Sequence, residues 1–330
     1  MPTRDLTKLQ RQIFRDIRRI EDDFVSQIML NYKYALDDTR LILGKLYEKY
    51  SKSGALTYAE MSKFNRLEKL YGQLSDLLGE TFSANGNLVE NLCKVQYQES
   101  FYRSAWAIDQ NLGVSLSWGL LDPKTVEAAI RSPEWRRLKN IAITTWKRDT
   151  FAKLDRTITQ GLIQGQSYGK MAKALKSGVY ENSAAKAMRI ARTEGHRASI
   201  QGKLRHIDEA ERLGVKVQRV WDATLDKATR PEHGELDGQV ANKEGFFNTS
   251  FGLVQGPGLS GIPEEDINCR CTIREQIEGY APKERGIRDE GVQPYKTYSE
   301  WAKDKGIKTE IMKKRYENLR RIRKRTGVGR

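Results

Sequence analysis

The sequence contains little cysteine and little histidine. Its 330 residues include three cysteines (Cys93, Cys269 and Cys271) and three histidines. Three cysteines cannot supply a disulfide framework for a chain of this size, so we expect a reducing compartment such as a bacterial cytoplasm. With so few histidines, general acid–base catalysis has few candidate groups.

Long apolar runs are also missing. No stretch of about 18 consecutive apolar residues occurs, so we expect no membrane span. The first twenty residues carry charges throughout, which differs from the apolar core of a signal peptide. Hydrophobic residues make up only 38% of the chain, which is low for one large globular core and favours helices with much solvated surface.

Common catalytic motifs are absent as well. The sequence has no phosphate-binding Gly-x-x-x-x-Gly-Lys-Ser/Thr, no His-Glu-x-x-His and no Gly-x-Ser-x-Gly. We therefore expect that the protein is not an enzyme.

Positive charge is abundant. Lysine and arginine number 58 against 43 acidic residues, a formal net charge of +15, which attracts nucleic acid or acidic protein surfaces. The charge is dense in a polar tail, residues 276–330, where such side chains neutralise phosphates without reading base sequence. The candidate DNA-binding residues are Lys313, Lys314, Arg315, Arg320, Arg321, Arg323, Lys324 and Arg325.

Apolar residues recur every three or four positions over the first 112 residues, which predicts long antiparallel helices joined by short turns. The first helix begins at Leu6 and ends before a break at 51–54. The second runs from Thr57 to about Phe82, and Asn85-Gly86-Asn87 is expected to form a turn. A third helix is expected from Leu88 to about Asn111.

Further helices are predicted over 134–164, 168–175 and 183–213, the last ending at Gly214. The alternation over 215–221 indicates a strand, and residues 222–273 are rich in turn-forming types, which predicts short strands. The fold class is therefore α+β. We expect an elongated helical domain (1–165), a small α+β domain (166–275) and a basic tail (276–330).

A group of polar residues lies on the helix before the strand and in the loop after it. Glu194 and Arg197 share a helix face, and small residues around them allow another element to approach. The group could form an acid or anion site, but we favour an ion-paired structural cluster, because Arg makes strong charge-assisted pairs. Its members are Arg192, Glu194, Arg197, Asp226, Arg230 and Asp237.

Cys269-Arg270-Cys271 is a candidate metal motif. Residues i and i+2 of a strand face the same side, so both thiols could reach one Zn²⁺. His233 is the obvious third ligand, with Asp226, Asp237 or His196 as a possible fourth. Alternatively, the cysteines are two small residues packed in a reduced core.

The ordered pieces of this region resemble the phage Mu protein F-like family of head morphogenesis, or minor head, proteins. The resemblance covers 80 to 100 residues, with a long helical region ahead of it that also fits. The matching residues are Arg192-Thr193-Glu194, Arg197, Trp221, Thr224, Asp226, Arg230, His233, Leu236-Asp237-Gly238, Phe246-Phe247, Pro257-Gly258 and Ile267-Asn268-Cys269-Arg270-Cys271.

The resemblance implies a virion component inside the phage head, made in the bacterial cytoplasm. Its expected partners are the portal protein, capsid or scaffolding protein, and double-stranded DNA bound without sequence preference. Many relatives carry toxin or nuclease domains, whereas this chain has only the basic tail after the matched region. Lys227-Ala228 departs from the polar residues of relatives and weakens transfer of a catalytic role.

Two alternatives stay open. The first is a metal-dependent nuclease or hydrolase that uses His233, Cys269 and Cys271. The second is a nucleoid-type DNA-binding protein, although the sequence contains no recognisable DNA-docking module.

Overall fold

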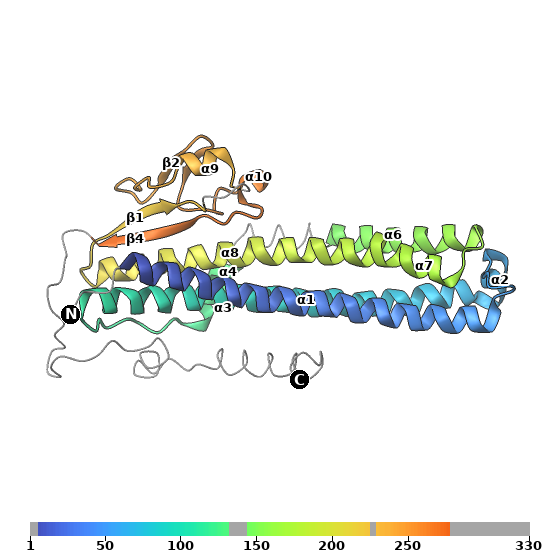
Figure 1. Ribbon diagram of the computed structural model, residues 1–330. Coiled ribbons are helices and arrows are strands. Elements are labelled where there is room, and N and C mark those ends of the chain that lie inside the picture. The colour runs from blue at the N-terminus through green and yellow to red at the C-terminus, as the bar shows by residue number, and fades with distance from the viewer. Residues whose placement is uncertain (1–5, 132–143, 225–228, 278–330) are drawn as a thin grey trace. The chain divides into compact units, whose positions relative to one another are not determined.

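The computed structural model describes residues 6–131, 144–224 and 229–277, and long helices dominate it (Figure 1). The helices of this part are α1 (Leu6–Tyr50), α2 (Tyr58–Ser62), the 3₁₀ turn η1 (Lys63–Asn65), α3 (Arg66–Leu112), α4 (Pro123–Ile130), α6 (Thr144–Ile163), α7 (Tyr168–Leu175), the π-helical turn η3 (Lys176–Tyr180), α8 (Glu181–Arg212), α9 (Pro231–Glu235) and α10 (Pro263–Asp266). The strands are β1 (Val217–Asp222), β2 (Phe247–Thr249), β3 (Gly252–Val254) and β4 (Thr272–Ile277).

The chain divides into two compact units that are interleaved along the sequence. Unit 1 combines Met1–Asp23, Asn91–Ser132 and Arg192–Arg330, and unit 2 combines Phe24–Glu90 and Pro133–Ala191. Helices α1, α3 and α8 each contribute residues to both units. The predicted domain boundaries at residues 165 and 275 lie where the amino-acid composition and the apolar periodicity change. They stay a prediction.

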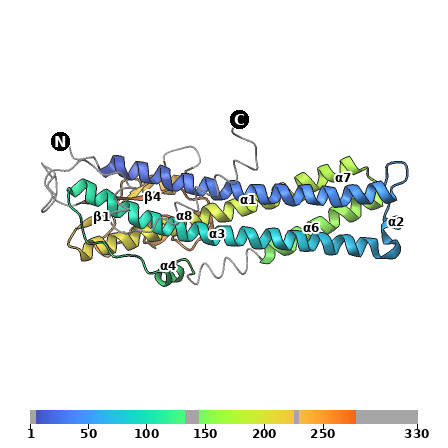
Figure 2. The ribbon, with the colours of Figure 1, turned by 90° about the horizontal axis from the view of Figure 1, so that it is seen from below.

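Unit 2 is helical, and aromatic rings form the centre of its core. Phe82 of α3 meets Trp146 of α6 edge-on at a centroid distance of 4.5 Å, and Tyr32 of α1 lies 6.4 Å from Phe82. Such edge-to-face pairs add about 0.5–1.5 kcal/mol beyond the apolar area that they bury. Figure 2 shows α1 and α3 running along one another.

The expected turn at Asn85-Gly86-Asn87 is wrong, because α3 continues through it. Asn85 is buried, and its Oδ1 accepts a hydrogen bond of 2.8 Å from Asn31 of α1. Together with the burial of Phe82 and Val89 on either side of this segment, such tertiary contacts outweigh the cost of one glycine inside a helix, about 1 kcal/mol. The expected helix from Thr57 is instead interrupted at Phe64 and Asn65, whose φ angles are 55° and 56°.

Other predicted elements are confirmed. Thr57 caps α2 by accepting a hydrogen bond from the backbone N–H of Glu60. The predicted helix at 168–175 is α7, the helix predicted at 183–213 is α8, and the strand predicted at 215–221 is β1. The α+β class is confirmed too, with antiparallel strands in the C-terminal part of the chain. Within the described ranges, no helix combines the length and apolarity needed to cross a membrane.

In unit 1, α8 packs directly on the backbone of α3. A Cβ placed on Gly202 would lie 2.2 Å from the carbonyl oxygen of Tyr97, so no side chain fits at this crossing. Small residues permit such an approach because they lack the atoms that hold two backbones apart. The close contact fixes the helical surface on which the strands of unit 1 lie.

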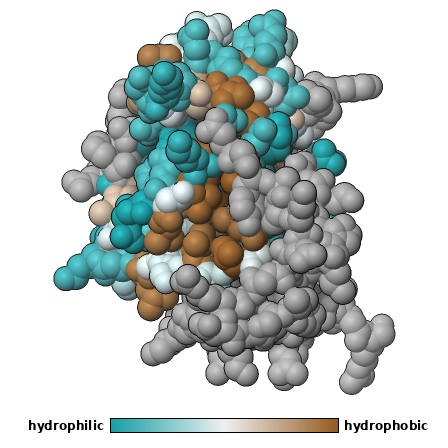
Figure 3. Space-filling model, turned by 90° about the vertical axis from the view of Figure 1, so that its left-hand side faces the viewer, coloured by the Kyte–Doolittle hydropathy of each residue, from teal (hydrophilic) through white to brown (hydrophobic). Residues whose placement is uncertain are grey.

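The strands form two antiparallel pairs. β1 pairs with β4, with Trp221 opposite Ile273, and β2 pairs with β3, with Phe247 opposite Val254. Their inward side chains join apolar residues of α3 and α8 in one buried cluster that also contains Cys269 and Cys271. Leu116, Trp118 and Val215 pack against the cluster from its rim. Figure 3 shows apolar surface gathered on the left-hand side of the view in Figure 1.

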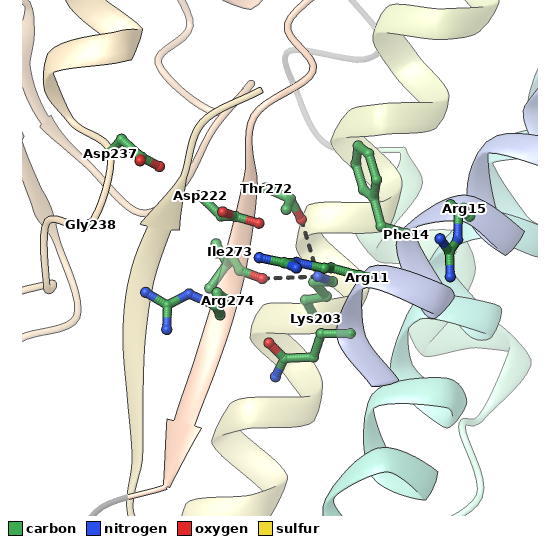
Figure 4. Close-up of a pocket in the computed structure, with 11 residues that line it drawn as sticks. Arg11, Phe14, Arg15, Lys203, Asp222, Asp237, Gly238, Thr272, Ile273 and Arg274 are labelled. Carbon is green, nitrogen blue, oxygen red and sulfur yellow. Dashed lines mark hydrogen bonds between the residues drawn. The ribbon is translucent and has the colours of Figure 1, made fainter. Parts of the chain in front are cut away.

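Two side chains from helices bind the backbone of β4. Lys203 of α8 is buried, and its Nζ donates hydrogen bonds to the Ile273 carbonyl at 2.9 Å and the Thr272 hydroxyl at 3.1 Å (Figure 4). The side-chain amide of Gln10 of α1 donates to the backbone carbonyl of Glu275 at 3.0 Å and accepts a hydrogen bond from the backbone N–H of Glu275 at 3.2 Å. The β1–β4 pair is therefore fixed to α8 and to the start of α1.

Gly202 of α8 and Gly86 of α3 have opposite surroundings: there is no room for a Cβ atom at Gly202 and open space at Gly86. Gly202→Ala should lower the free energy of unfolding by about 1–3 kcal/mol, because the new methyl group overlaps the Tyr97 carbonyl. Gly86→Ala is the matched control: nothing lies within 4 Å of its Cβ position, so it should stabilise by about 0.5–1 kcal/mol. Urea unfolding of both variants checks this, and a destabilised Gly86→Ala would contradict the continuous helix.

Lys203→Met should destabilise unit 1, because it leaves buried acceptors on β4 without their donor. The expected loss is about 1–3 kcal/mol, measured by thermal or urea unfolding at neutral pH. Lys216→Met, at an exposed lysine, is the control and should change stability by less than about 0.5 kcal/mol. Equal effects of the two substitutions would show that the β4 contact contributes nothing.

Candidate metal centre

His233 reaches the interior of unit 1 on a short helix that begins at a proline. Pro231 takes the first position of α9, where its missing N–H costs nothing. His233 is only 2% exposed. Its ring lies near those of Trp221 and Phe251, at centroid distances of 5.8 and 5.9 Å. The imidazole is therefore surrounded largely by apolar groups.

Cys269 and Cys271 lie in the segment that joins α10 to β4. Asn268 turns the chain there with a φ of 56°, a left-handed conformation in which asparagine is enriched among non-glycine residues. Both cysteines are buried, at 4% and 2% exposure. The turn and the start of β4 thus place two thiols inside the apolar cluster.

The structure brings these two thiols and His233 together. The Nδ1 atom of His233 lies 3.6 Å from the Sγ of Cys269 and 3.6 Å from the Sγ of Cys271. All three atoms lie within 4.8 Å of one another. Two sulfurs and one imidazole nitrogen at this spacing match three of the four positions of a tetrahedral zinc site.

A carboxylate orients the histidine from its other side. The Nε2 atom of His233 lies 2.9 Å from the Oε2 of Glu265 on α10. Glu265 was not among the predicted site residues. It lies four positions before Cys269 in an acidic turn, Glu264-Glu265-Asp266, and a search for a carboxylate partner of His233 could have found it there.

The charges of this group depend on one another. A hydrogen bond from the Cys269 thiol and the neighbouring His233 lower the pKa of Cys271 to about 5, although burial opposes them. The pKa of Cys269 is raised in turn by Cys271 and by burial. Burial opposes protonation of His233, but Cys271 and Glu265 raise its pKa above the usual value. One thiolate therefore forms readily in this group.

The fourth ligand suggested by the sequence is not found among the described residues. Asp237 and His196 lie outside the group of three, and Asp226 falls outside the described ranges. Asp237 instead accepts a hydrogen bond of 2.9 Å from the backbone of Ala223. The described part of the chain thus offers three ligand atoms.

Three side chains, one from α8 and two from the loop between β1 and α9, hold the segment that carries the cysteines. Thr193 of α8 accepts a hydrogen bond from the backbone N–H of Asn268 at 3.2 Å. The Thr224 hydroxyl donates to the carbonyl of Arg270 at 2.8 Å, and Arg230 donates to the carbonyl of Ile267 at 2.7 Å. Sequence reasoning gave no role to Thr193 or Thr224, because their partners are backbone atoms some 45 to 75 residues away.

The remaining residues of the predicted polar cluster make separate contacts. Glu194 is buried, and its nearest paired cation is Arg197, with 3.9 Å between Oε2 and Nη1. Burial raises the pKa of Glu194 to about 7, while Arg197 opposes the shift. Arg192 is half exposed and approaches Glu21 of α1, at 3.6 Å. The ion pair expected on the α8 face is present, and Arg192 points to a different partner.

A basic cavity of about 550 Å³ lies beside the β1–β4 pair. Figure 4 shows Arg11 and Phe14 of α1, Lys203 of α8 and Arg274 of β4 around it. Arg15 adds a further cation, and two carboxylates, Asp222 and Asp237, also line it. Burial and the neighbouring Asp237 raise the pKa of Asp222. The eight predicted DNA-binding residues of the tail lie outside the described ranges.

Comparison with known proteins places this region in a family. The model of the phage Mu protein F-like proteins matches residues 152–274, which include the whole His/Cys/Cys group. The minor head protein GP7 of Bacillus phage SPP1 is 31% identical over 275 residues, covering 82% of this chain and 89% of GP7. No solved structure matches the chain.

A second relative is named for an enzymatic activity. The NAD(+)–arginine ADP-ribosyltransferase EFV of Enterococcus faecalis is 26% identical over 281 residues, which are 85% of this chain but 57% of that protein. An uncharacterised protein of Haemophilus influenzae is 26% identical over 157 residues, 46% of this chain. The ordered motif from Arg192 to Cys271 and the similarity to GP7 across most of both chains agree. This chain belongs to the phage Mu protein F-like family of phage head proteins.

Proposed function

We propose that this chain is a minor head protein that associates with the portal and contacts packaged DNA during head morphogenesis. The observation that carries the proposal is the 31% identity to the minor head protein GP7 over 82% of this chain and 89% of that protein. Similarity over nearly the full length of both chains favours a shared role in the head. Capsid or scaffolding protein is a further expected partner, and the protein would be located inside the virion.

Charge supports the contact with DNA. The net charge of +15 opposes the dense negative charge of packaged DNA. The last 18 positions of the sequence contain nine basic residues, eight of them the candidate DNA-binding residues. In unit 1, Arg11 and Arg15 are exposed on α1 and form no ion pair within the described part of the chain. Binding through such side chains would be independent of base sequence.

A structural role is favoured over catalysis. The three residues of the candidate metal centre are each no more than 4% exposed, so a large substrate would not reach them without rearrangement. The chain spans only 57% of the relative named as an ADP-ribosyltransferase, so that relative contains much sequence without a counterpart here. Similarity to it therefore does not carry the activity across.

Binding to DNA should be strong at low salt and fall steeply as salt rises. Each phosphate contact should contribute about −0.9 to the slope of log affinity against log salt. Changing Arg320, Arg321, Arg323 and Lys324 to Gln should therefore make the slope about 3–4 shallower. Fluorescence anisotropy with unrelated duplexes at several salt concentrations measures both the slope and the indifference to sequence.

The matched control removes four exposed lysines of unit 2, Lys45, Lys49, Lys69 and Lys153, by the same change to Gln. It should leave most of the slope intact. An equal loss in the control would mean that total charge acts rather than the tail. Absence of binding at low salt, or binding that resists salt, would contradict DNA contact altogether.

Association with the portal predicts that the protein enters heads only when portal protein is present. Heads assembled from capsid and scaffolding proteins, with and without the portal, can be purified and this chain quantified by mass spectrometry. We expect incorporation in the first case and loss of most of it in the second. Equal incorporation into heads that lack a portal would show that capsid or scaffolding protein is the docking partner instead.

A further inference from the structure

We propose that His233, Cys269 and Cys271 bind one Zn²⁺ through the Nδ1 and the two Sγ atoms, and that this ion ties α9 to the start of β4. Nothing in the similarity to GP7 or in the family match assigns a metal. The proposal rests on the arrangement of these side chains in unit 1.

The spacing of the three atoms matches a tetrahedral ion. Zn–S bonds of about 2.3 Å and Zn–N bonds of about 2.0–2.1 Å, at a tetrahedral angle, put nitrogen and sulfur about 3.6 Å apart. Both observed Nδ1–Sγ distances are 3.6 Å. The two sulfurs are therefore at equal distances from the nitrogen, as two ligands of one centre would be.

Hydrogen bonding alone explains this arrangement less well. When the Nε2–H of His233 donates to Glu265, Nδ1 carries a single lone pair in the ring plane. One lone pair accepts one well-aligned hydrogen bond, so Cys271 can donate to Nδ1 while Cys269 donates to Cys271. That arrangement does not require the two sulfurs to lie at the same distance from Nδ1, as they do. An ion between the three atoms uses the lone pair once and satisfies both sulfurs.

The surroundings also resemble those of a metal site. A carboxylate that accepts a hydrogen bond from the second nitrogen of a ligating histidine fixes the tautomer and the ring orientation. Glu265 has that position, 2.9 Å from Nε2. Two soft thiolates and one imidazole favour zinc over magnesium or calcium, which prefer oxygen. The apolar rings of Trp221 and Phe251 shield the site from solvent.

The ion would join α9 to the segment before β4, and the chain between them contains only short helices and strands. His233 lies 36 and 38 residues before the two cysteines. Between them lie the three-residue strands β2 and β3 and the four-residue helix α10. A cross-link that closes a loop of this length stabilises the folded state by restricting the unfolded chain. Removal of the metal should therefore loosen residues 231–271 first.

The first test uses the full chain purified without chelators. Elemental analysis should find one zinc per chain in the wild type and in Cys93→Ser, which removes the third buried cysteine, outside the group. Cys269→Ser and Cys271→Ser should each lose the metal. Absence of zinc in the wild type, together with no uptake on titration of metal-free protein, would overturn the proposal. The proposal would also be overturned if Cys93→Ser lost the zinc while Cys269→Ser and Cys271→Ser kept it.

Cobalt gives an independent spectroscopic test that does not depend on a variant that folds. Metal-free wild-type protein titrated with Co²⁺ should develop sulfur-to-cobalt charge-transfer absorption and the visible bands of tetrahedral cobalt. Octahedral cobalt bands without charge transfer would show oxygen ligands and contradict the site. Glu265→Gln, which removes the negative charge of the group bound to Nε2, should keep the stoichiometry and weaken zinc binding by about 10–100-fold.

Hydrogen exchange then tests the tie between α9 and β4. Chelation should increase amide exchange within 231–271 in the wild type and in Cys93→Ser, and leave unit 2 unchanged. In Cys271→Ser, chelation should have no effect, because no ion remains to be removed. Unchanged exchange in wild-type protein that has demonstrably lost its zinc would refute the structural role of the ion.

Discussion

The close approach of α8 to α3 determines how unit 1 is built. At Gly202 the two backbones leave no room for a side chain, so the helices meet at a fixed separation. From this position α8 offers Lys203 to the backbone of β4 and Thr193 to the turn at Asn268. The strands and the segment with the cysteines are therefore positioned by α8, which can approach α3 closely because residue 202 is a glycine.

Much of the fold follows from sequence periodicity, and the exceptions have identifiable causes. The apolar stripe of α1, the cap at Thr57 and the strand β1 are local signals that the structure keeps. Asn85-Gly86-Asn87 has the composition of a turn, but it is helical, and Asn85 binds Asn31, 54 residues earlier in the chain. No local pattern contains that partner.

The candidate metal centre shows the same division. The Cys-x-Cys spacing and the scarcity of histidine were enough to group His233 with Cys269 and Cys271 from the sequence. Glu265 was not predicted: the acidic turn at 264–266 contains three carboxylates, and a four-residue helix has no periodicity that distinguishes them. The partners of Thr193 and Thr224 are backbone atoms, which every residue has, so the sequence does not indicate which residues they bind. Chemistry that depends on side-chain identity is thus visible in the sequence, whereas chemistry that depends on docking is not.

The interleaved composition of unit 1 has a consequence for the order of folding during synthesis. Gln10 finds its partner on β4 265 residues later in the chain. The N-terminal end of α1 therefore leaves the ribosome long before β4, to which it binds. At a synthesis rate of about 5–20 residues per second, that wait lasts on the order of 13 to 50 seconds. Contacts of such long sequence separation form slowly, so the side chain of Gln10 has no partner on β4 until 265 further residues have been made.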